Sequence, residues 1–271
     1  MSTLISRGRG PGGGLMAKVK GLKYRIFPRF KFSRSQYKNY WDSVSTDERH
    51  AKIAVGGHVD EQSYTSTAIS TMHMLKQFVG INAEDVVLEI GAGFGRVGAV
   101  LAPMCKEWIG ADVSKNMLSH LRKRLAGLKN VRTVLLNGFD LSNIESSSVD
   151  VVYCTVVFMH LEEWERFSYI KEGFRVLRPG GRMLVDNVDL TTDEGWTFFL
   201  SHAKIPPEKR PPNISKTSTP QELETYFARA GYEKLGFANL GLWAIMHGSK
   251  PIAPAPLHPH AYSSAPRIQP I

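Results

Sequence analysis

Two carboxylates and a cluster of glycines have the spacing of a small-molecule site. Glu89 lies near the end of an apolar run over residues 86–90 that is typical of a buried strand, and Asp112 follows a second such run. Three glycines come directly after the first run: Gly91, Gly93 and Gly95. Helical spacing begins after them, so they form a strand-to-helix turn whose unpaired backbone N–H groups are open to a ligand. Because Asp112 can accept two hydroxyls of a ribose, the stretch predicts a cradle for a nucleoside.

The same glycines allow two other interpretations. Gly93, Gly95 and Gly98 satisfy the G-x-G-x-x-G dinucleotide fingerprint, with Asp112 at about the expected distance. That fingerprint puts its first glycine directly after the strand, where this chain already has Gly91. A NAD-dependent oxidoreductase is therefore an alternative, and so is a turn whose glycines only allow close packing.

The order of the motifs indicates a family. VLEIGAGFGR followed by IGADVSKNML resembles the first two motifs of class I S-adenosylmethionine-dependent methyltransferases, and the resemblance extends over about residues 85–248, including an Arg-Pro-Gly-Gly turn before a strand. It implies S-adenosyl-L-methionine as cofactor, with Glu89 near its amino-acid end and Asp112 on the ribose. The cofactor-binding residues that it implies are Glu89, Gly91, Ala92, Gly93, Gly95, Asp112, Val113, Met117, Asn137, Gly138, Phe139 and Thr155.

The expected adenine partner differs from the family pattern. The family often has an acidic residue just after the third strand, where it accepts a hydrogen bond from the exocyclic amine of the cofactor's adenine. Here Asn137 and Gly138 stand nearest that place, and Asp140 follows slightly later.

One histidine is placed to act as a base. His160 follows the apolar run of residues 149–157, at the carboxyl end of the fourth expected strand and so at the mouth of the cleft. The alternative is a histidine that caps this strand end without touching substrate. His58 and His202, on segments without regular pattern, are the other candidates.

Metal chemistry and nucleic-acid substrates are not expected. Asp186 and Asn187 resemble the Asp-Asn pair of catechol-type O-methyltransferases, but Thr155 stands where those enzymes have an Asp and is a poor Mg²⁺ ligand. We therefore predict no metal. The Asn-Pro-Pro-Tyr type motif of base-methylating enzymes is also absent, which disfavours a DNA or RNA base as acceptor.

The elements that position these residues alternate along the chain. Helices are expected over 65–79, 114–125 with Ser114 as N-cap, 161–177 and 219–230. Strands are expected over 86–90, 108–111, 131–136, 149–157, 232–239 and 242–248, and the remaining strand, fifth in chain order, lies between the Arg-Pro-Gly-Gly turn and Asp186. Such alternation predicts an α/β fold: a Rossmann-like, doubly wound, mostly parallel seven-stranded sheet with helices on both faces. The family resemblance implies that residues 37–70 pack over the cofactor cleft.

The domain organisation follows from charge and proline content. Residues 1–38 hold ten of the 34 Lys and Arg residues and no acid, so they predict a largely disordered basic arm with a short amphipathic segment. Residues 39–249 form the methyltransferase domain, in which the proline-interrupted residues 188–218 are expected to form a substrate lid. The proline-rich residues 250–271 are expected to be disordered.

Composition and cysteine positions indicate where in the cell the protein is expected. No apolar run approaches the ~20 residues of a membrane span, and Cys105 and Cys154 fall where small core residues are expected, so a reducing, cytoplasmic location is predicted. The predicted reaction is O-methylation of a small-molecule or sugar hydroxyl by in-line displacement. The alternative from another class is a non-catalytic binding or scaffolding protein. The basic arm is expected either to be solvated or to meet a membrane or another anionic surface, rather than nucleic acid.

Overall fold

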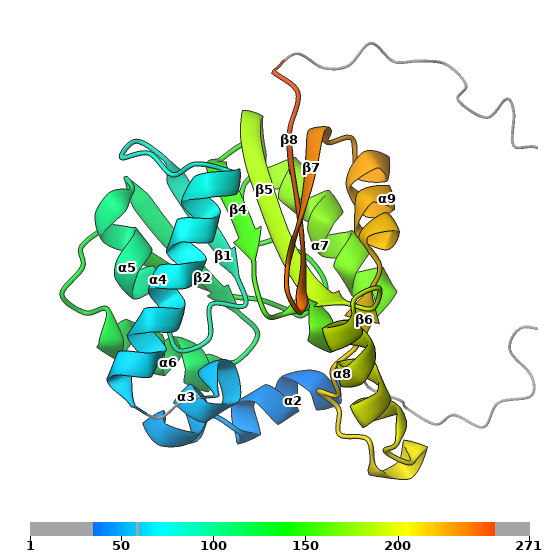
Figure 1. The fold of residues 1–271 in the computed structure, drawn as a ribbon. Coiled ribbons are helices and arrows are strands. Elements are labelled where there is room, and N and C mark those ends of the chain that lie inside the picture. Colours follow the sequence, from blue (N-terminus) through cyan, green and yellow to red (C-terminus); the bar gives the residue numbers. More distant parts are fainter. Residues whose placement is uncertain (1–34, 58–59, 253–271) are drawn as a thin grey trace, which may run out of the picture. The chain divides into compact units, whose positions relative to one another are not determined.

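The computed structural model describes residues 35–57 and 60–252 (Figure 1). The basic arm before residue 35, His58 and the tail after residue 252 lie outside the described residues. The sequence places the end of the arm at residue 38, but helix α2 already begins at Ser35. Tyr37 in this helix packs against the core of the domain.

A single sheet with the order β3-β2-β1-β4-β5-β8-β7 forms the centre of the domain, and β6 pairs with β5 beside this path. The strands are β1 Val86–Ile90, β2 Glu107–Asp112, β3 Val131–Leu135, β4 Val149–Cys154, β5 Leu177–Asp189, β6 Thr217–Ser218, β7 Glu233–Leu240 and β8 Trp243–Ser249. Neighbours from β3 to β5 are parallel, and β8 is antiparallel to both β5 and β7. The predicted Rossmann-like, doubly wound sheet is confirmed, with the two-residue β6 in addition.

Helices cover both faces of the sheet (Figure 1). They are α2 Ser35–Ser43, α3 Glu48–Gly56, α4 Glu61–Phe78, α5 Gly98–Leu101, α6 Lys115–Arg124, α7 Glu163–Val176, α8 Asp193–Ala203 and α9 Pro220–Ala230, with 3-10 turns η1 Ala102–Met104, η2 Phe158–His160 and η3 Pro207–Lys209. Leu88 and Ile90 of β1 pack on the side of α7 and α9, whereas Val87 packs on the side of α4, α5 and α6. Successive side chains of β1 therefore contribute alternately to two hydrophobic cores, one on each face of the sheet.

Caps fix the ends of two helices as the sequence predicts. The Ser114 side chain accepts a hydrogen bond from Met117 N at the start of α6, and the Thr219 side chain accepts one from Glu222 N at the start of α9. Gly231 ends α9 in the left-handed conformation, with a φ of 98°. Residues with a β-carbon rarely adopt that conformation, so Gly is the expected stop signal.

Three segments differ from the expectation. The strand expected over 149–157 ends at Cys154, and the Arg-Pro-Gly-Gly turn is part of β5, which pairs irregularly with β4 there. The proline-interrupted segment contains the regular helix α8, because its four prolines all come after Ala203. Its two ends join the sheet as the end of β5 and as β6.

The last glycine of the dinucleotide fingerprint has a packing role. A β-carbon on Gly98 would lie 2.6 Å from Trp108 Cη2, and one on Gly110 would lie 2.5 Å from the same atom. The fully buried indole of Trp108 therefore occupies the space of two absent side chains. Gly98 is explained without a pyrophosphate.

Candidate functional site

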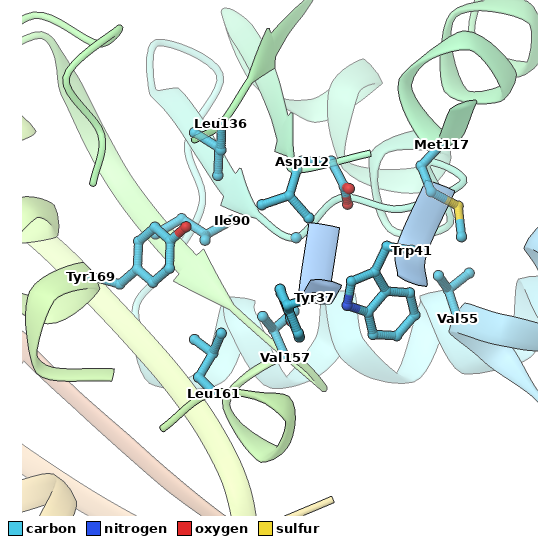
Figure 2. A pocket seen from close by; sticks show the side chains of 12 residues that line it. Tyr37, Trp41, Val55, Ile90, Asp112, Met117, Leu136, Val157, Leu161 and Tyr169 are labelled. Atoms are coloured by element: carbon cyan, nitrogen blue, oxygen red, sulfur yellow. The ribbon is translucent and has the colours of Figure 1, made fainter. Parts of the chain in front are cut away.

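A mostly apolar pocket lies at the carboxyl ends of β1 and β2 (Figure 2). About 520 Å³ of space lies between its walls, part of it open to solvent. It is lined by Tyr37, Trp41, Val55, Ile90, Gly91, Asp112, Val113, Met117, Leu136, Val157, Leu161 and Tyr169. Its apolar walls and its few polar groups are typical of a small-molecule site.

Asp112 is the charged side chain of this lining. Its Oδ2 accepts a hydrogen bond from Gly93 N at 2.8 Å, and its Oδ1 accepts one from Ser114 N, also at 2.8 Å. Burial raises the pKa of the carboxyl to about 6, although the two backbone donors lower it. Each oxygen keeps a lone pair for a further donor, so the carboxylate can still receive two hydroxyls.

Hydrogen bonds fasten the helix α2 wall of the pocket to the start of α6. Ser114 Oγ donates to Asp42 Oδ1 at 2.8 Å, and Asn116 Nδ2 donates to Asp42 O at 2.9 Å. Ser45 adds two bonds, one between its Oγ and Ser114 Oγ at 3.2 Å and one between its carbonyl and His120 Nε2 at 3.0 Å. We call these four bonds the α2 latch. The latch and Asp112 share Ser114, which links the pocket wall to the Asp112 carboxylate.

Gly91 brings the main chain into the pocket. Its φ is 77°, and a β-carbon there would lie 2.3 Å from Val157 Cγ2. Val157 follows Val156, whose φ of 60° is unusual for a β-branched residue. Val156 N donates to Asp186 Oδ1 at 2.6 Å. The carboxyl of Asp186 therefore supports the turn that places Val157 against Gly91.

Glu89 lies behind the glycine turn, on the face of β1 that carries Val87. Its Oε2 accepts a 2.6 Å hydrogen bond from the Tyr153 hydroxyl, which in turn accepts one from Trp108 Nε1. Burial raises the pKa of Glu89 to about 8, while the Tyr153 bond and the charge of Arg96 lower it. A partner cation at this position would favour the ionised form.

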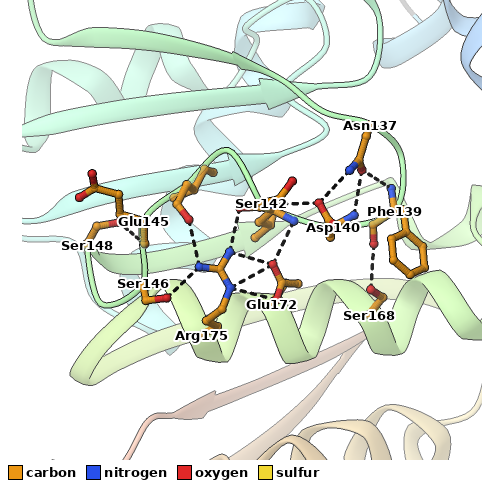
Figure 3. Close-up of polar contacts among 12 residues, drawn as sticks. Asn137, Phe139, Asp140, Ser142, Glu145, Ser146, Ser148, Ser168, Glu172 and Arg175 are labelled. Atoms are coloured by element: carbon orange, nitrogen blue, oxygen red, sulfur yellow. Dashed lines mark hydrogen bonds and ion pairs between the residues drawn. The ribbon is translucent and has the colours of Figure 1, made fainter.

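The loop after β3 uses its own polar groups to fix its shape (Figure 3). Asn137 Oδ1 accepts from Phe139 N and Asp140 N, and Asn137 Nδ2 donates to Asp140 Oδ1. Arg175 of α7 holds the rest of the loop by donating to Leu141 O, Ile144 O and Ser146 Oγ. Gly138, with a φ of 85°, permits the tight turn. The Asn137 side chain thus supports the loop, leaving mainly backbone groups for a ligand.

His160 ends η2 next to the pocket wall. Its ring centroid lies 5.1 Å from that of Trp41, and its Nδ1 donates to Asn213 O at 2.8 Å. This bond leaves Nε2 with the lone pair. Burial, with a smaller effect of the Lys216 charge, lowers the pKa of the imidazole to about 4, although the bond to Asn213 O raises it. His160 is therefore neutral near pH 7. Lys216 N also donates to Met159 O, so residues 213–216 of the expected lid are attached to η2.

The predicted residues occupy three positions around the pocket. Gly91, Asp112, Val113 and Met117 line it, and Ala92, Gly93 and Gly95 form the turn beside it. Glu89 and Thr155 are buried near the strand ends without lining it, while Asn137, Gly138 and Phe139 follow the lining residue Leu136. His202 lies on α8, where it packs against Phe198 and not in the pocket lining.

Sequence reasoning did not identify the aromatic wall. Tyr37 and Trp41 come from α2 and Val55 from α3, so the segment expected over the cleft does line it, but no periodicity singled out these side chains. Leu161 and Tyr169 fall within the helix expected over 161–177 and were not singled out as site residues. This helix follows the fourth strand, and that position at the carboxyl end of the sheet is the signal that could have found them.

The described residues form neither a metal-binding cluster nor a membrane-spanning helix. Within residues 35–57 and 60–252, no group of three or more His, Cys, Asp or Glu side chains is arranged to hold a metal ion. No helix in the same ranges is long and apolar enough to cross a membrane. Cys105 and Cys154 are both buried and free, as predicted.

Comparison with known proteins gives a consistent result. A family described as a methyltransferase domain matches residues 88–185. Demethylmenaquinone methyltransferase of Clavibacter sepedonicus is 35% identical over 147 residues, covering 54% of this chain and 55% of that protein. Human thiol S-methyltransferase TMT1A is 29% identical over 135 residues, covering 49% and 54%. The chain thus spans about half the length of these curated relatives.

A solved structure extends the similarity to the whole fold. Magnesium protoporphyrin IX methyltransferase from Synechocystis PCC 6803, with bound S-adenosylhomocysteine, superposes with a TM-score of 0.61 at 17% identity, over 80% of this chain and 100% of that one. At this identity the similarity shows the fold alone.

Proposed function

Because the chain carries a class I S-adenosylmethionine-dependent methyltransferase domain, we propose that it transfers the methyl group of this cofactor to a hydroxyl of a small molecule. The observation that supports this most directly is Asp112. It is a buried carboxylate at the end of β2, held by Gly93 N and Ser114 N, and it lines the pocket. A ribose needs such a double acceptor.

The described residues suit the cofactor. Asp112 would hold the ribose hydroxyls, the left-handed Gly91 would let the backbone approach, and Val113 and Leu136 offer apolar walls to a base. Glu89 would lie near the amino-acid end, where a buried carboxylate favours an ammonium group. When bound, the cofactor supplies an electrophilic methyl group on sulfur. The protein then has mainly to hold an acceptor in line and exclude water.

His160 would receive the proton of the acceptor hydroxyl. Its Nδ1–H is fixed on Asn213 O, which presents Nε2 as the free acceptor. With a pKa of about 4, the ring is neutral over the whole physiological range and needs no prior deprotonation. The expected lid over residues 188–218 would carry Asn213 and so determine the orientation of this base.

The acceptor would be an apolar or aromatic hydroxyl compound. Tyr37, Trp41, Val157, Leu161 and Tyr169 surround the side of the pocket near His160 and provide flat, apolar contacts. A sugar would leave several hydroxyls without partners against such walls. The names of the two curated relatives refer to a thiol and to demethylmenaquinone, so within the family the acceptor follows the pocket rather than the fold.

Calorimetry with S-adenosylhomocysteine and with NAD tests the cofactor. The wild type should bind S-adenosylhomocysteine and not NAD, and Asp112→Asn should weaken binding about tenfold or more, since a hydrogen bond to a charged group contributes ~1.5–3 kcal/mol. Asp150→Asn is the matched control, because Asp150 also accepts a backbone bond, from Val86 N, on β4. Binding of NAD alone, or equal losses in both variants, would remove Asp112 from the site.

Turnover tests the reaction. Wild-type chain with S-adenosylmethionine should release S-adenosylhomocysteine in the presence of phenolic compounds and not of sugars. Cofactor binding without turnover on any hydroxyl compound, amine or thiol would support a non-catalytic binding protein instead.

A further inference from the structure

Helix α8 has an apolar stripe that faces away from the domain. Trp196, Phe199 and Leu200 are 50%, 38% and 40% exposed, and Ala203 is exposed one turn further. Their spacing of i, i+3, i+4 and i+7 places them on one face of the helix. The Trp196 and Phe199 rings stack with their centroids 5.3 Å apart. The stripe is thus an ordered apolar surface in contact with water.

The opposite face of α8 is attached to the domain. Gly195 is buried so close to β5 that a β-carbon would lie 1.6 Å from Asp189 O. Thr192 caps the helix by accepting from Gly195 N, and its hydroxyl donates to Asp189 O. Phe198 and His202 on this side are partly buried and pack on each other. The helix is therefore fixed at its start, while Trp196 stays exposed to solvent.

Cations gather at the end of the stripe. Lys204, Lys209 and Arg210 follow α8 and are all exposed, with Glu208 as the acidic residue among them. Lys216, further on, is engaged with Glu162 at 3.3 Å. An apolar helix face with a tryptophan and neighbouring lysines and arginines is the pattern of a helix that lies in a membrane interface.

We propose that α8 docks on the surface of an anionic lipid bilayer. Trp196, Phe199 and Leu200 enter the boundary between headgroups and acyl chains, and Lys204, Lys209 and Arg210 lie against lipid phosphates. A stable protein partner would contact about 20–30 residues on each side, whereas this stripe offers three large side chains, which a bilayer can take up by insertion.

The sequence before residue 35 supports the same partner. It contains nine Lys or Arg residues and no acid, so its positive charge adds a second attraction to an anionic lipid surface. Membrane binding by one weak element is marginal, and two elements together make it stable. The docking is independent of the proposed methyl transfer, because it needs neither cofactor nor acceptor.

Vesicle co-sedimentation of the full chain tests the docking. Vesicles of phosphatidylcholine alone are compared with vesicles that also contain phosphatidylglycerol. The wild type should bind the mixed vesicles, and the triple variant Trp196→Ser, Phe199→Ser, Leu200→Ser should show a partition coefficient at least about tenfold lower, since insertion scales with buried apolar area. Trp164→Ser on α7 is the control; this residue is 67% exposed, more than any member of the stripe, and its loss should leave binding unchanged.

A charge-reversal variant and a measurement of self-association distinguish lipid docking from the other possible outcomes. The variant Lys204→Glu, Lys209→Glu, Arg210→Glu should lose the preference for anionic vesicles. Because the stripe is exposed, melting curves should show that the variants are folded. Equal binding of wild type and triple variant would mean that the basic arm acts alone. A wild-type dimer in light scattering that the triple variant lacks would identify the stripe as a subunit interface. Either result overturns the proposal.

Discussion

Glu89→Gln should stabilise the ligand-free fold at high pH. Glu89 is buried on β1, accepts one bond from the Tyr153 hydroxyl, and has a pKa raised by burial to about 8. A glutamine has nearly the same shape and can still accept from Tyr153. The substitution therefore removes the cost of a buried negative charge and little else.

The magnitude follows from proton linkage. The folded pKa is about 8 against a reference of 4.5, so between these values the folded chain keeps a proton that the unfolded chain has lost. The free energy of unfolding then falls as pH rises, by 1.36 kcal/mol per unit, or ~5 kcal/mol over the window as an upper bound. Asp112 and Asp186, with pKa values raised by burial to about 6 and about 7, contribute in the same direction at lower pH.

Urea unfolding of the ligand-free protein at pH 5, 7 and 9 measures this effect. The wild type should lose stability at each step. Glu89→Gln should match it within ~1 kcal/mol at pH 5, exceed it by a few kcal/mol at pH 9, and change little between pH 7 and 9. Glu107→Gln is the control, because Glu107 lies on the adjacent β2 and pairs with Arg132 at the surface.

The same variant should bind the cofactor less well. In the proposed site the ammonium group of the cofactor would favour the ionised form of Glu89, which a glutamine cannot adopt, so the variant should bind S-adenosylhomocysteine about tenfold or more weakly. A wild type that gains stability between pH 5 and 9, or a Glu89→Gln variant with an unchanged pH profile, would contradict a buried carboxyl that holds its proton.

Two further predictions concern the base and the basic arm. His160→Ala should lower turnover by ~10²–10⁴-fold with S-adenosylhomocysteine affinity unchanged, and the wild-type rate should rise with pH only around 4 and stay flat near neutrality; a rate that rises through pH 7 would point to another base. A chain that starts at Ser35 should melt at the same temperature and bind S-adenosylhomocysteine as the full chain does, whereas a lost transition would show that residues before 35 belong to the core.

The sheet and its flanking caps could be read from the sequence because their signals are local. β1, β2 and β4 are runs of apolar residues buried on both faces, which makes them continuous rather than alternating in sequence. Ser114, through its hydroxyl, and Gly231, through its lack of a β-carbon, each suit one position at a helix end. Such signals do not depend on what the element later packs against.

Helices α2, α3 and α8 were not predicted, although Asp47 and Thr192 cap the starts of α3 and α8. The stripe of α8 has helical spacing, but Phe198 adds apolar character on another side, and the prolines that follow the helix favoured an irregular segment. Helix α2 is fastened by the bonds that Asp42 and Ser45 make with α6, more than 65 residues away in sequence. Tertiary contacts of this kind cannot be seen in a local pattern.

The glycine turn was ambiguous because two causes give the same spacing. Gly91 is required by its left-handed φ and by Val157, whereas Gly98 is required by the volume of Trp108. A sequence shows that no side chain is present at a position, but it does not show what occupies the space. Only the packing of the glycines distinguishes the interpretation as a nucleoside cradle from the interpretation as a dinucleotide fingerprint.

The α2 latch also bears on how quickly the pocket can exchange its contents. Tyr37 and Trp41 form one wall, which is kept in place by four hydrogen bonds of ~1 kcal/mol each and by the packing of both rings on apolar clusters of the domain. Opening the wall would break these contacts and leave the ladder of the sheet intact, so we expect α2 to open as a local unit. A ligand that fills the pocket favours the attached state. Since the ligand can leave only when the wall opens, we expect the opening of this one helix to govern product release.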